Sequence, residues 1–387
     1  MTPEGVARLS GIEAIAAFLD APHVALASSL ASQSEPLLGP TDPATDEAAR
    51  AEARRLLSAM GRSGLLDSIG SADTRALCLT RETVAGINPL ADVVLALQAL
   101  VATPLRLAGT DAQRERWLGP LQSGEVMAAF AMSEPEAGSD VAALQTTARR
   151  SGDGWVLDGA KHLISNAGIA DLYLVFARTT ADAGNRGISA FLVPAGTGGL
   201  RFVVPQLTAA GHPLGRIALE GCQVGPDALL GKLDDGFRLG MMTLDLLRPT
   251  VGASACGMAR RALVESLRHA TSRRQFGEPL SEFPIIRDKI GRMATSLDAA
   301  RLLVYRAAWQ ADNHDARITL EAAMAKSFAT EAAQEIIDEA VQIAGGLGVL
   351  LGHPVERLYR AVRALRIYEG TTEIQRQIVA GELLRER

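Results

Sequence analysis

The chain changes character at Ala129-Phe130-Ala131-Met132-Ser133-Glu134-Pro135-Glu136-Ala137-Gly138-Ser139-Asp140. A short apolar run leads into Ser-Glu-Pro and then into a Gly-Ser turn, which is typical of the end of a β-strand. Such a turn offers hydroxyls and backbone N–H groups that can cradle a polar ring edge or a phosphate. The alternative is an ordinary exit from a strand into a turn, and this segment taken alone favours that alternative.

The residues before this segment have the pattern of helices. Up to about Gly124 they are rich in Ala and Leu, and apolar residues recur at helical spacing. The predicted helices cover 47–60, 90–107 and 111–121.

The residues after this segment, as far as about Gly236, have the pattern of strands. Short runs of β-formers are broken by Gly, Pro, Asn and Asp. We expect Ser151-Gly152-Asp153-Gly154 to turn a hairpin. The other predicted strands are Leu172–Arg178, Ile188–Val193 and Ile217–Val224.

From Phe237 onward the helical period returns. Apolar residues step by three or four along two stretches, which gives each helix one apolar stripe. Helices of this kind pack side by side as a bundle. Pro249 lies within the first stripe and predicts a bend or a local gap in hydrogen bonding near Arg248. The two stripes are 244, 247, 251, 255, 258, 262 and 286, 290, 293, 297, 300, 304.

These patterns predict three domains in an α+β fold. We expect a helical domain over 1–125, a β domain over 126–236 and a helical bundle over 237–387. With 387 residues, 48% of them hydrophobic and 21% charged, the chain can bury two or three cores. We detect no internal repeat.

Composition excludes several classes of function. A formal net charge of −5 argues against nucleic acid as the main ligand. The apolar stretches, such as 93–101, fall short of the roughly 20 residues of a membrane span, and no secretory leader is read at the start. We therefore expect a soluble, cytoplasmic protein without a membrane span.

The cysteines and histidines predict no metal site and no disulfide. Three cysteines are far apart in the sequence, and six histidines are scattered without a pair at metal-ligand spacing. The cysteines are Cys78, Cys222 and Cys256.

Near the C-terminus, Glu369 has the setting of a catalytic base. It lies between Tyr368 and Gly370, just before an expected helix start. Apolar surroundings raise the pKa of a carboxyl group toward the range of a general base, and N–H groups at a helix start can polarise a carbonyl oxygen. The alternative is a helix entry with Thr371 or Thr372 as N-cap and Glu369 as a solvated acid.

Two segments in the helical part have alternative interpretations. Arg273-Arg274-Gln275-Phe276-Gly277 is either a helix C-cap or a clamp for a pyrophosphate, since the guanidinium fork suits phosphate. Gln342-Ile343-Ala344-Gly345-Gly346-Leu347-Gly348 is either a cap or a place where a cofactor approaches the backbone. A Rossmann fingerprint is absent from the sequence.

Four motifs, in this order, resemble the acyl-CoA dehydrogenase family. The resemblance extends over nearly the whole chain and is weakest before about residue 45. It implies that family's fold, with an N-terminal helical domain, a middle β-barrel domain and a C-terminal four-helix-bundle domain. The motifs are Ser133-Glu134-Pro135-x-Ala137-Gly138-Ser139-Asp140, Gly159-x-Lys161-x-x-Ile164-Ser165-Asn166-Ala167, Arg273-x-Gln275-Phe276-Gly277 and Tyr368-Glu369-Gly370-Thr371.

The resemblance implies an FAD enzyme that oxidises a saturated acyl-CoA to its trans-2-enoyl-CoA. A carboxylate removes the α-proton while hydride leaves the β-carbon for flavin N5, and Glu369 would be that carboxylate. Its backbone N–H and a ribityl hydroxyl would bind the thioester oxygen, a contribution of about 3 kcal/mol. Some members carry the base one residue before the arginine of a Leu-Asp-x-x-Arg run, but here that residue is Leu247, which cannot ionise.

The resemblance also assigns residues to the cofactor and the substrate. The implied FAD contacts are Phe130, Met132, Ser133, Gly138, Ser139, Leu163, Ile164, Ser165, Phe276, Thr371 and Glu373, and the implied contacts to the FAD of a neighbouring subunit are Arg273, Gln342, Gly345 and Gly346. The implied acyl-CoA contacts are Ser139, Asp245, Arg248, Tyr368 and Gly370.

The implied partners are a homo-oligomer, usually a tetramer built as a dimer of dimers, and an electron-transfer flavoprotein as acceptor. Leu163 stands where the family usually has Trp, which bears on the exit of electrons. Two alternatives stay open: an oxidase-type relative that uses oxygen or acts on a carrier-bound acyl group, and a non-catalytic flavin- or DNA-binding relative.

Overall fold

A computed structural model describes residues 11–314 and 317–385 of the chain. The chain divides into two compact units. The helical unit comprises the described residues up to Asp42, Ala72–Asp92 and Asp245–Arg387. The sheet unit comprises Pro43–Ser71 and Val93–Leu244. Helical N- and C-terminal parts around a central, sheet-rich part confirm the predicted fold class, and the three domain boundaries stay a prediction.

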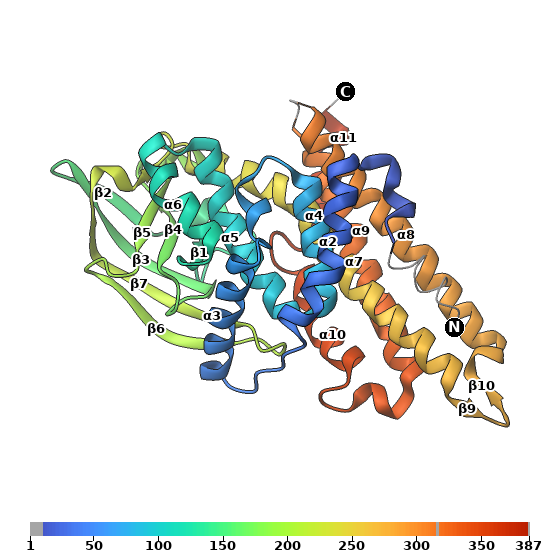
Figure 1. Ribbon diagram of the computed structural model, residues 1–387. Coiled ribbons are helices and arrows are strands. Elements are labelled where there is room, and N and C mark those ends of the chain that lie inside the picture. The colour runs from blue at the N-terminus through green and yellow to red at the C-terminus, as the bar shows by residue number, and fades with distance from the viewer. Residues whose placement is uncertain (1–10, 315–316, 386–387) are drawn as a thin grey trace. The chain divides into compact units, whose positions relative to one another are not determined.

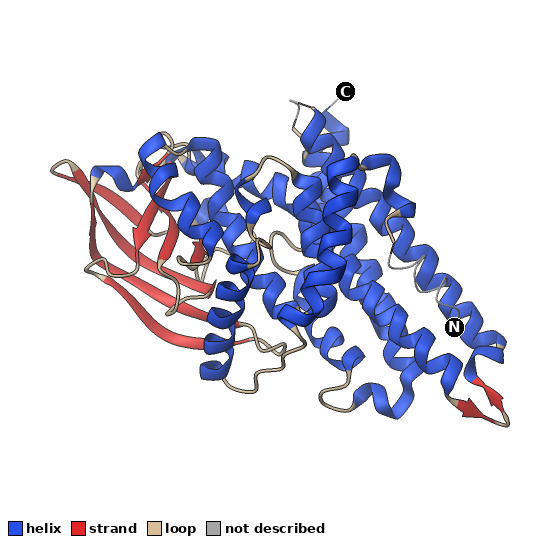
Figure 2. Ribbon diagram, viewed as in Figure 1, coloured by secondary structure: helices blue, strands red, loops and turns tan. Residues whose placement is uncertain are grey.

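The sheet unit is built on one eight-stranded sheet with the order β6-β7-β3-β2-β4-β5-β8, and β1 pairs with β4 (Figure 2). The three strands predicted outside the hairpin are confirmed as β4, β5 and β7. The strands are β1 Ala128–Ala131, β2 Thr147–Ser151, β3 Gly154–Ser165, β4 Leu172–Arg178, β5 Ile188–Pro194, β6 Leu200–Leu207, β7 Pro213–Val224 and β8 Leu229–Leu230.

The predicted hairpin joins β2 to β3. The strands are antiparallel, with Ser151 opposite Gly154. Gly152 in the turn has a φ of 59°, in the left-handed region that glycine adopts without a Cβ penalty. Glycine at this position therefore fixes the register of β2 on β3.

One helix of the sheet unit is tied to the sheet by arginines. Helix α3 (Asp46–Arg62) contacts β6 and β7, and it is one of the predicted helices, as is α6 (Asp111–Ser123). The Arg50 guanidinium donates to the Leu214 carbonyl oxygen (2.8 Å), and Arg54 pairs with Asp171 (2.7 Å). The core of the sheet includes Trp155 and Phe191, whose ring centroids are 5.5 Å apart.

The helical unit packs long helices through small residues. Figure 1 shows α7, α8 and α9 side by side, and a side chain added at Gly252 of α7 would meet both Val304 of α8 and Ala329 of α9. The helices are α2 Ala21–Leu38, α4 Thr74–Ile87, α8 Pro284–Asn313, α9 Thr319–Ala344, α10 Pro354–Val362, α11 Thr372–Arg385 and most of α7 Gly236–Ser272.

Helix α7 continues as one helix through Pro249. The six residues of the predicted stripe from 244 to 262 are all buried, which confirms that stripe. Proline lacks an N–H, and in the same turn the Thr250 hydroxyl donates to the Leu247 carbonyl oxygen at 2.7 Å. The proline does not end the helix, and the predicted bend stays a prediction.

A β-hairpin that the sequence did not predict follows α7. Strands β9 (Arg274–Gln275) and β10 (Glu278–Pro279) pair around Phe276 and Gly277. Both turn residues have positive φ, 51° and 86°. A two-residue hairpin turn of type I′ requires positive φ at both central residues. The sequence Phe-Gly is a weaker signal for this turn than Asn-Gly.

One helix, α5 (Pro89–Ala108), is long and apolar enough to cross a membrane by length and composition. Most of it is buried inside the protein, and the core helix of a soluble protein passes the same test. The prediction of 90–107 as a helix is confirmed, and the cytoplasmic location stays a prediction.

A test of the close helix packing is Gly257→Ala in α7. A Cβ at this position would lie 1.9 Å from the Glu82 carbonyl oxygen of α4, so the helices must move apart. We expect a loss of about 1–3 kcal/mol in the free energy of unfolding, measured by urea titration. Gly291→Ala in α8 is the control, because nothing lies within 4 Å of its added Cβ. An equal effect of both changes would contradict the account.

Candidate active site

Glu369 lies in a short left-handed loop of the helical unit, just before α11. Its φ is 55° and that of Gly370 is 94°. A left-handed conformation is strained for glutamate, and such residues are maintained only where surrounding contacts hold them. Thr371 accepts a hydrogen bond from the Ile374 N–H at 3.3 Å, so Thr371 caps α11 as one alternative expected, but the Glu369 Oε2 atom is buried and not solvated as that alternative required.

Side chains from three helices hold the carbonyl oxygens of this loop. Arg248 of α7 donates from Nε to the Glu369 oxygen at 3.3 Å. Lys326 of α9 donates from Nζ to the Gly370 oxygen at 2.7 Å. Gln375 of α11 donates to both oxygens at 3.1 Å. Together these donors fix the backbone around the carboxylate.

The Glu369 carboxyl group is unusual in its surroundings. Its Oε2 atom is buried and has no hydrogen-bond partner among the described residues. Burial raises the pKa of Glu369 above its ordinary value, and the charges of Arg81, Lys326 and Arg248 oppose that rise. A carboxylate whose pKa is raised accepts a proton more readily than an ordinary glutamate, which suits a general base.

Two of the surrounding cations are held by acids of their own. Arg81 is bound by both oxygens of Asp92, each at 2.8 Å. Arg248 donates to Asp245 at 2.7 Å, and Asp245 also accepts from Arg317 at 2.7 Å. The predicted residues Asp245 and Arg248 are thus a buried pair, of which Arg248 reaches the Glu369 loop.

Tyr368 and Leu247 complete the surroundings. Burial raises the pKa of Tyr368, so its hydroxyl stays protonated. Leu247 is buried and cannot ionise. Glu369 therefore has no rival base at that position of α7.

In the sheet unit, the two loops predicted to face one planar ligand lie together. The His162 N–H, at the end of β3, donates to the Ser133 carbonyl oxygen at 3.0 Å. A buried ion pair ties the same segments, because Lys161 Nζ lies 2.7 Å from Glu134. Glu134 also accepts a hydrogen bond from the Thr146 N–H at 3.0 Å, so this carboxylate is bound by more than one donor.

These loops fit a flavin. Leu163 lies within β3, where it has a φ of 55° and is 54% exposed. Gly138 and Ser139 are exposed, whereas Met132 and Ile164 are buried beneath the surface. An exposed apolar side chain such as Leu163 can pack against a flat ring. Half-buried positions are Phe130, Ser133 and Ser165.

The helical unit carries predicted FAD contacts, including those expected to reach a neighbour's cofactor, at or near its surface. Phe276, at the tip of the β9–β10 hairpin, is 96% exposed. Gly345 follows the end of α9 with a φ of 62°, which confirms the cap interpretation. Arg273, Gln342, Gly346 and Glu373 are exposed too, and Thr371 is half-buried.

Sequence reasoning missed Lys326, Gln375 and Arg81. Lys326 lies on the buried, alanine-rich face of α9, between Ala325 and Ala329. A lysine on an apolar helical face was a usable signal, because lysine is almost never buried unless it is paired. No comparable signal marks Gln375.

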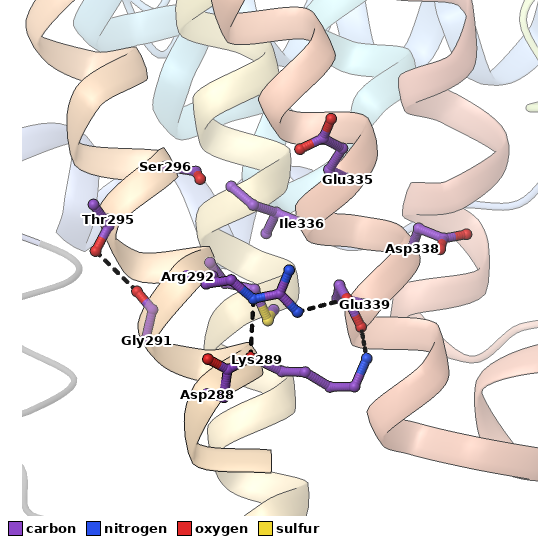
Figure 3. Close-up of a pocket in the computed structure, with 11 residues that line it drawn as sticks. Asp288, Lys289, Gly291, Arg292, Thr295, Ser296, Glu335, Ile336, Asp338 and Glu339 are labelled. Atoms are coloured by element: carbon purple, nitrogen blue, oxygen red, sulfur yellow. Dashed lines mark hydrogen bonds and ion pairs between the residues drawn. The ribbon is translucent and has the colours of Figure 1, made fainter. Parts of the chain in front are cut away.

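A separate pocket of about 640 Å³ lies between α8 and α9 and contains none of the predicted site residues. Figure 3 shows Glu339 directed at Lys289 and Arg292, with Arg292 at 3.4 Å. Arg292 also pairs with Asp288 at 3.1 Å. Because this pocket contains none of the predicted site residues, we do not assign it to the candidate site.

Two sequence families match the chain. They are "Acyl-CoA dehydrogenase, middle domain" over residues 129–222 and "Acyl-CoA dehydrogenase, C-terminal domain" over residues 234–384. The 3-(aryl)acrylate reductase of Clostridium sporogenes is 41% identical over 81% of this chain and 84% of its own length. The human mitochondrial short-chain specific acyl-CoA dehydrogenase is 40% identical over 84% of this chain and 81% of its own length.

Solved structures also resemble this chain. One, described as the electron transferring flavoprotein of Acidaminococcus fermentans in a study of flavin-based electron bifurcation, matches with a TM-score of 0.88 and 34% identity over 95% of this chain and 99% of that chain. Another, PigA with FAD and proline, matches with a TM-score of 0.86 and 25% identity over 95% and 99%. The chain is an oxidoreductase that belongs to the acyl-CoA dehydrogenase family, and FAD is its cofactor.

Proposed function

We propose that this protein removes hydrogen from the α and β carbons of a short-chain acyl-CoA, with Glu369 as the base. The observation that carries the proposal is the buried, unpartnered Oε2 atom of Glu369, surrounded by cations in a strained loop. A buried acid without a partner is costly, and such groups are concentrated at functional sites. The likeness to the human short-chain enzyme supports the choice of chain length.

In this mechanism the Glu369 carboxylate removes the α-proton and becomes a neutral acid. Loss of its charge is favoured by burial, while the charges of the nearby cations stabilise the carboxylate form. The Arg248, Lys326 and Gln375 contacts keep the loop in one conformation, so the carboxylate needs no reorganisation. Bound FAD supplies the acceptor for the hydride that leaves the β-carbon.

The residues of the sheet unit would hold the flavin. Ser133 lies after β1 and Leu163 lies in β3, and the Glu134–Lys161 pair joins these two segments. An electron-transfer flavoprotein is the proposed acceptor, and the likeness to the Acidaminococcus fermentans structure supports it.

A second candidate is the reverse reaction, reduction of a 3-arylacrylate or its thioester. The Clostridium sporogenes relative, 41% identical over 81% of the chain, favours it. Glu369 in its protonated form would then give its proton to the α-carbon. Reoxidation of the reduced protein by an arylacrylate, and not by a short-chain enoyl-CoA, would identify this direction.

Anaerobic flavin bleaching tests the base. We expect short-chain acyl-CoA to bleach the wild-type protein, and Glu369→Gln to slow the first turnover by about 10²–10⁴-fold, the usual contribution of a general base. Glu335→Gln, at an exposed acid of α9, is the control and should not change the rate. The wild-type rate should fall as the pH drops through the raised pKa of Glu369.

Three outcomes would contradict the proposal. Bleaching of Glu369→Gln at the wild-type rate would remove Glu369 as the base. Purified protein that fails to bind FAD would favour the non-catalytic alternative. A burst of peroxide during turnover in air would favour the oxidase.

We also propose a homo-oligomer. Apolar side chains are exposed on the helical unit around the end of α9: Leu351 is 82% exposed and Val349 69%, and Phe276 of the β9–β10 turn is 96% exposed. Large exposed apolar side chains that cluster mark interaction surfaces. Gly345 and Gly346, predicted to reach a neighbour's FAD, lie on the same stretch of chain.

Sedimentation equilibrium measures the oligomer. We expect a mass that is a multiple of the 40.8 kDa chain, with four copies as the proposed state. Leu351→Asp should lower the mass, since a charge in an apolar interface is costly. Val24→Asp is the control, because Val24 is an exposed residue of α2. A wild-type protein that sediments as a single chain would exclude this assembly.

A further inference from the structure

Lys326 is an ammonium group buried completely within the helical unit. Its side chain is 0% exposed, and its Nζ donates to the Gly370 carbonyl oxygen at 2.7 Å. Holding a carbonyl oxygen does not require a charge, because Gln375 binds the same oxygen with a neutral amide at 3.1 Å. A buried charge is expensive unless an anion faces it. The position of Lys326 therefore calls for an anion nearby.

The acids around Lys326 differ in what else they bind. Glu331, on the same helix, already pairs with Arg366 at 2.8 Å and accepts from the Thr372 hydroxyl at 2.7 Å. Glu373 of α11 is exposed to solvent. The remaining acid is Glu369, whose Oε2 has no hydrogen-bond partner among the described residues.

One cation also faces Lys326, namely Arg248 of α7. Arg248 is compensated by Asp245 at 2.7 Å. The repulsion between Arg248 and Lys326 is thereby reduced. Glu369 is then the acid that interacts most strongly with the Lys326 charge.

We infer that Lys326 is a positioning residue for the Glu369 base: its Nζ fixes the Gly370 carbonyl of the left-handed loop, and its positive charge keeps the Glu369 carboxylate ionised. The inference rests on the proposed function, because it takes Glu369 as the base. Lys326 touches neither reacting carbon in this scheme and acts through the loop and the carboxylate.

The charge of Lys326 has a pH limit of its own. Burial lowers its pKa to about 8, although Glu369 opposes that change. Below this pH Lys326 is charged and lowers the pKa of Glu369. Above this pH Lys326 is neutral and no longer stabilises the Glu369 carboxylate. Glu331, Glu373 and Arg248 are the other charged groups that act on Lys326. The wild-type protein should therefore show a second titration near pH 8.

The test separates charge from hydrogen bonding with Lys326→Gln and Lys326→Met. In both variants the midpoint at which the flavin reduction rate falls with acid should rise by roughly one pH unit, since a nearby opposite charge shifts a carboxyl pKa by 1–3 units. Lys326→Met should also lower the plateau rate, because the loop loses a donor. Lys326→Arg should restore the wild-type midpoint.

A readout that does not depend on turnover is the infrared band of the protonated Glu369 carboxyl, identified by its loss in Glu369→Gln. Its titration midpoint should rise in Lys326→Gln. Lys289→Gln, which removes a lysine of α8 paired with Glu339, is the matched control and should leave the midpoint unchanged.

Defined results would overturn the inference. Lys326→Gln with the wild-type midpoint for both rate and infrared band would show that the charge does not act on Glu369. If the Lys326 variants do not fold, the wild-type protein alone can be used. A Glu369 infrared band whose titration has no second inflection near pH 8 would also show that the Lys326 charge does not act on Glu369. Failure of the proposed function would give a different result. In that case the flavin of Glu369→Gln would bleach at the wild-type rate.

Discussion

The helical unit is organised around the Glu369 carboxylate, whose Oε2 atom is buried and has no hydrogen-bond partner in the part of the chain that the structure describes. A buried charge of this kind needs cations, and α4, α7 and α9 each supply one, in Arg81, Arg248 and Lys326. Because each cation must also be compensated, acids such as Asp92 and Asp245 are buried with them. The long helices thus carry a charged network as well as an apolar core, and the network keeps the Glu369 loop in a conformation that it would not adopt alone.

The sheet unit has a similar arrangement at the segments of Ser133 and Leu163. A buried lysine, Lys161, bridges the end of β1 and the strand β3 through Glu134 and the Met132 carbonyl oxygen, at 2.7 and 3.3 Å. In both units a buried ammonium group from a regular element holds the backbone of an irregular segment. Regular structure therefore provides the rigidity, and the loops provide the chemistry.

Local patterns predicted the elements well. The Gly152-Asp153 turn, the apolar stripe of α7 and the α3 helix follow from periodicity and turn residues, which act over a few positions. The candidate base, Glu369, was proposed from its neighbours and from family motifs, and its role stays a prediction. What could not be predicted comes from contacts distant in sequence: Lys326 meets Gly370 across 44 positions, and nothing in either segment specifies that meeting. The β9–β10 hairpin was missed because its Phe-Gly turn is a weak local signal.

The most direct measurement of the central claim is hydrogen exchange at the α-carbon of the substrate. With the flavin already reduced, hydride transfer is blocked, and only the base can act on a bound saturated acyl-CoA. Nuclear magnetic resonance in D₂O should show deuterium entering the α position with the wild-type protein and not with Glu369→Gln. Exchange at the wild-type rate in Glu369→Gln would contradict the assignment of Glu369 as the base.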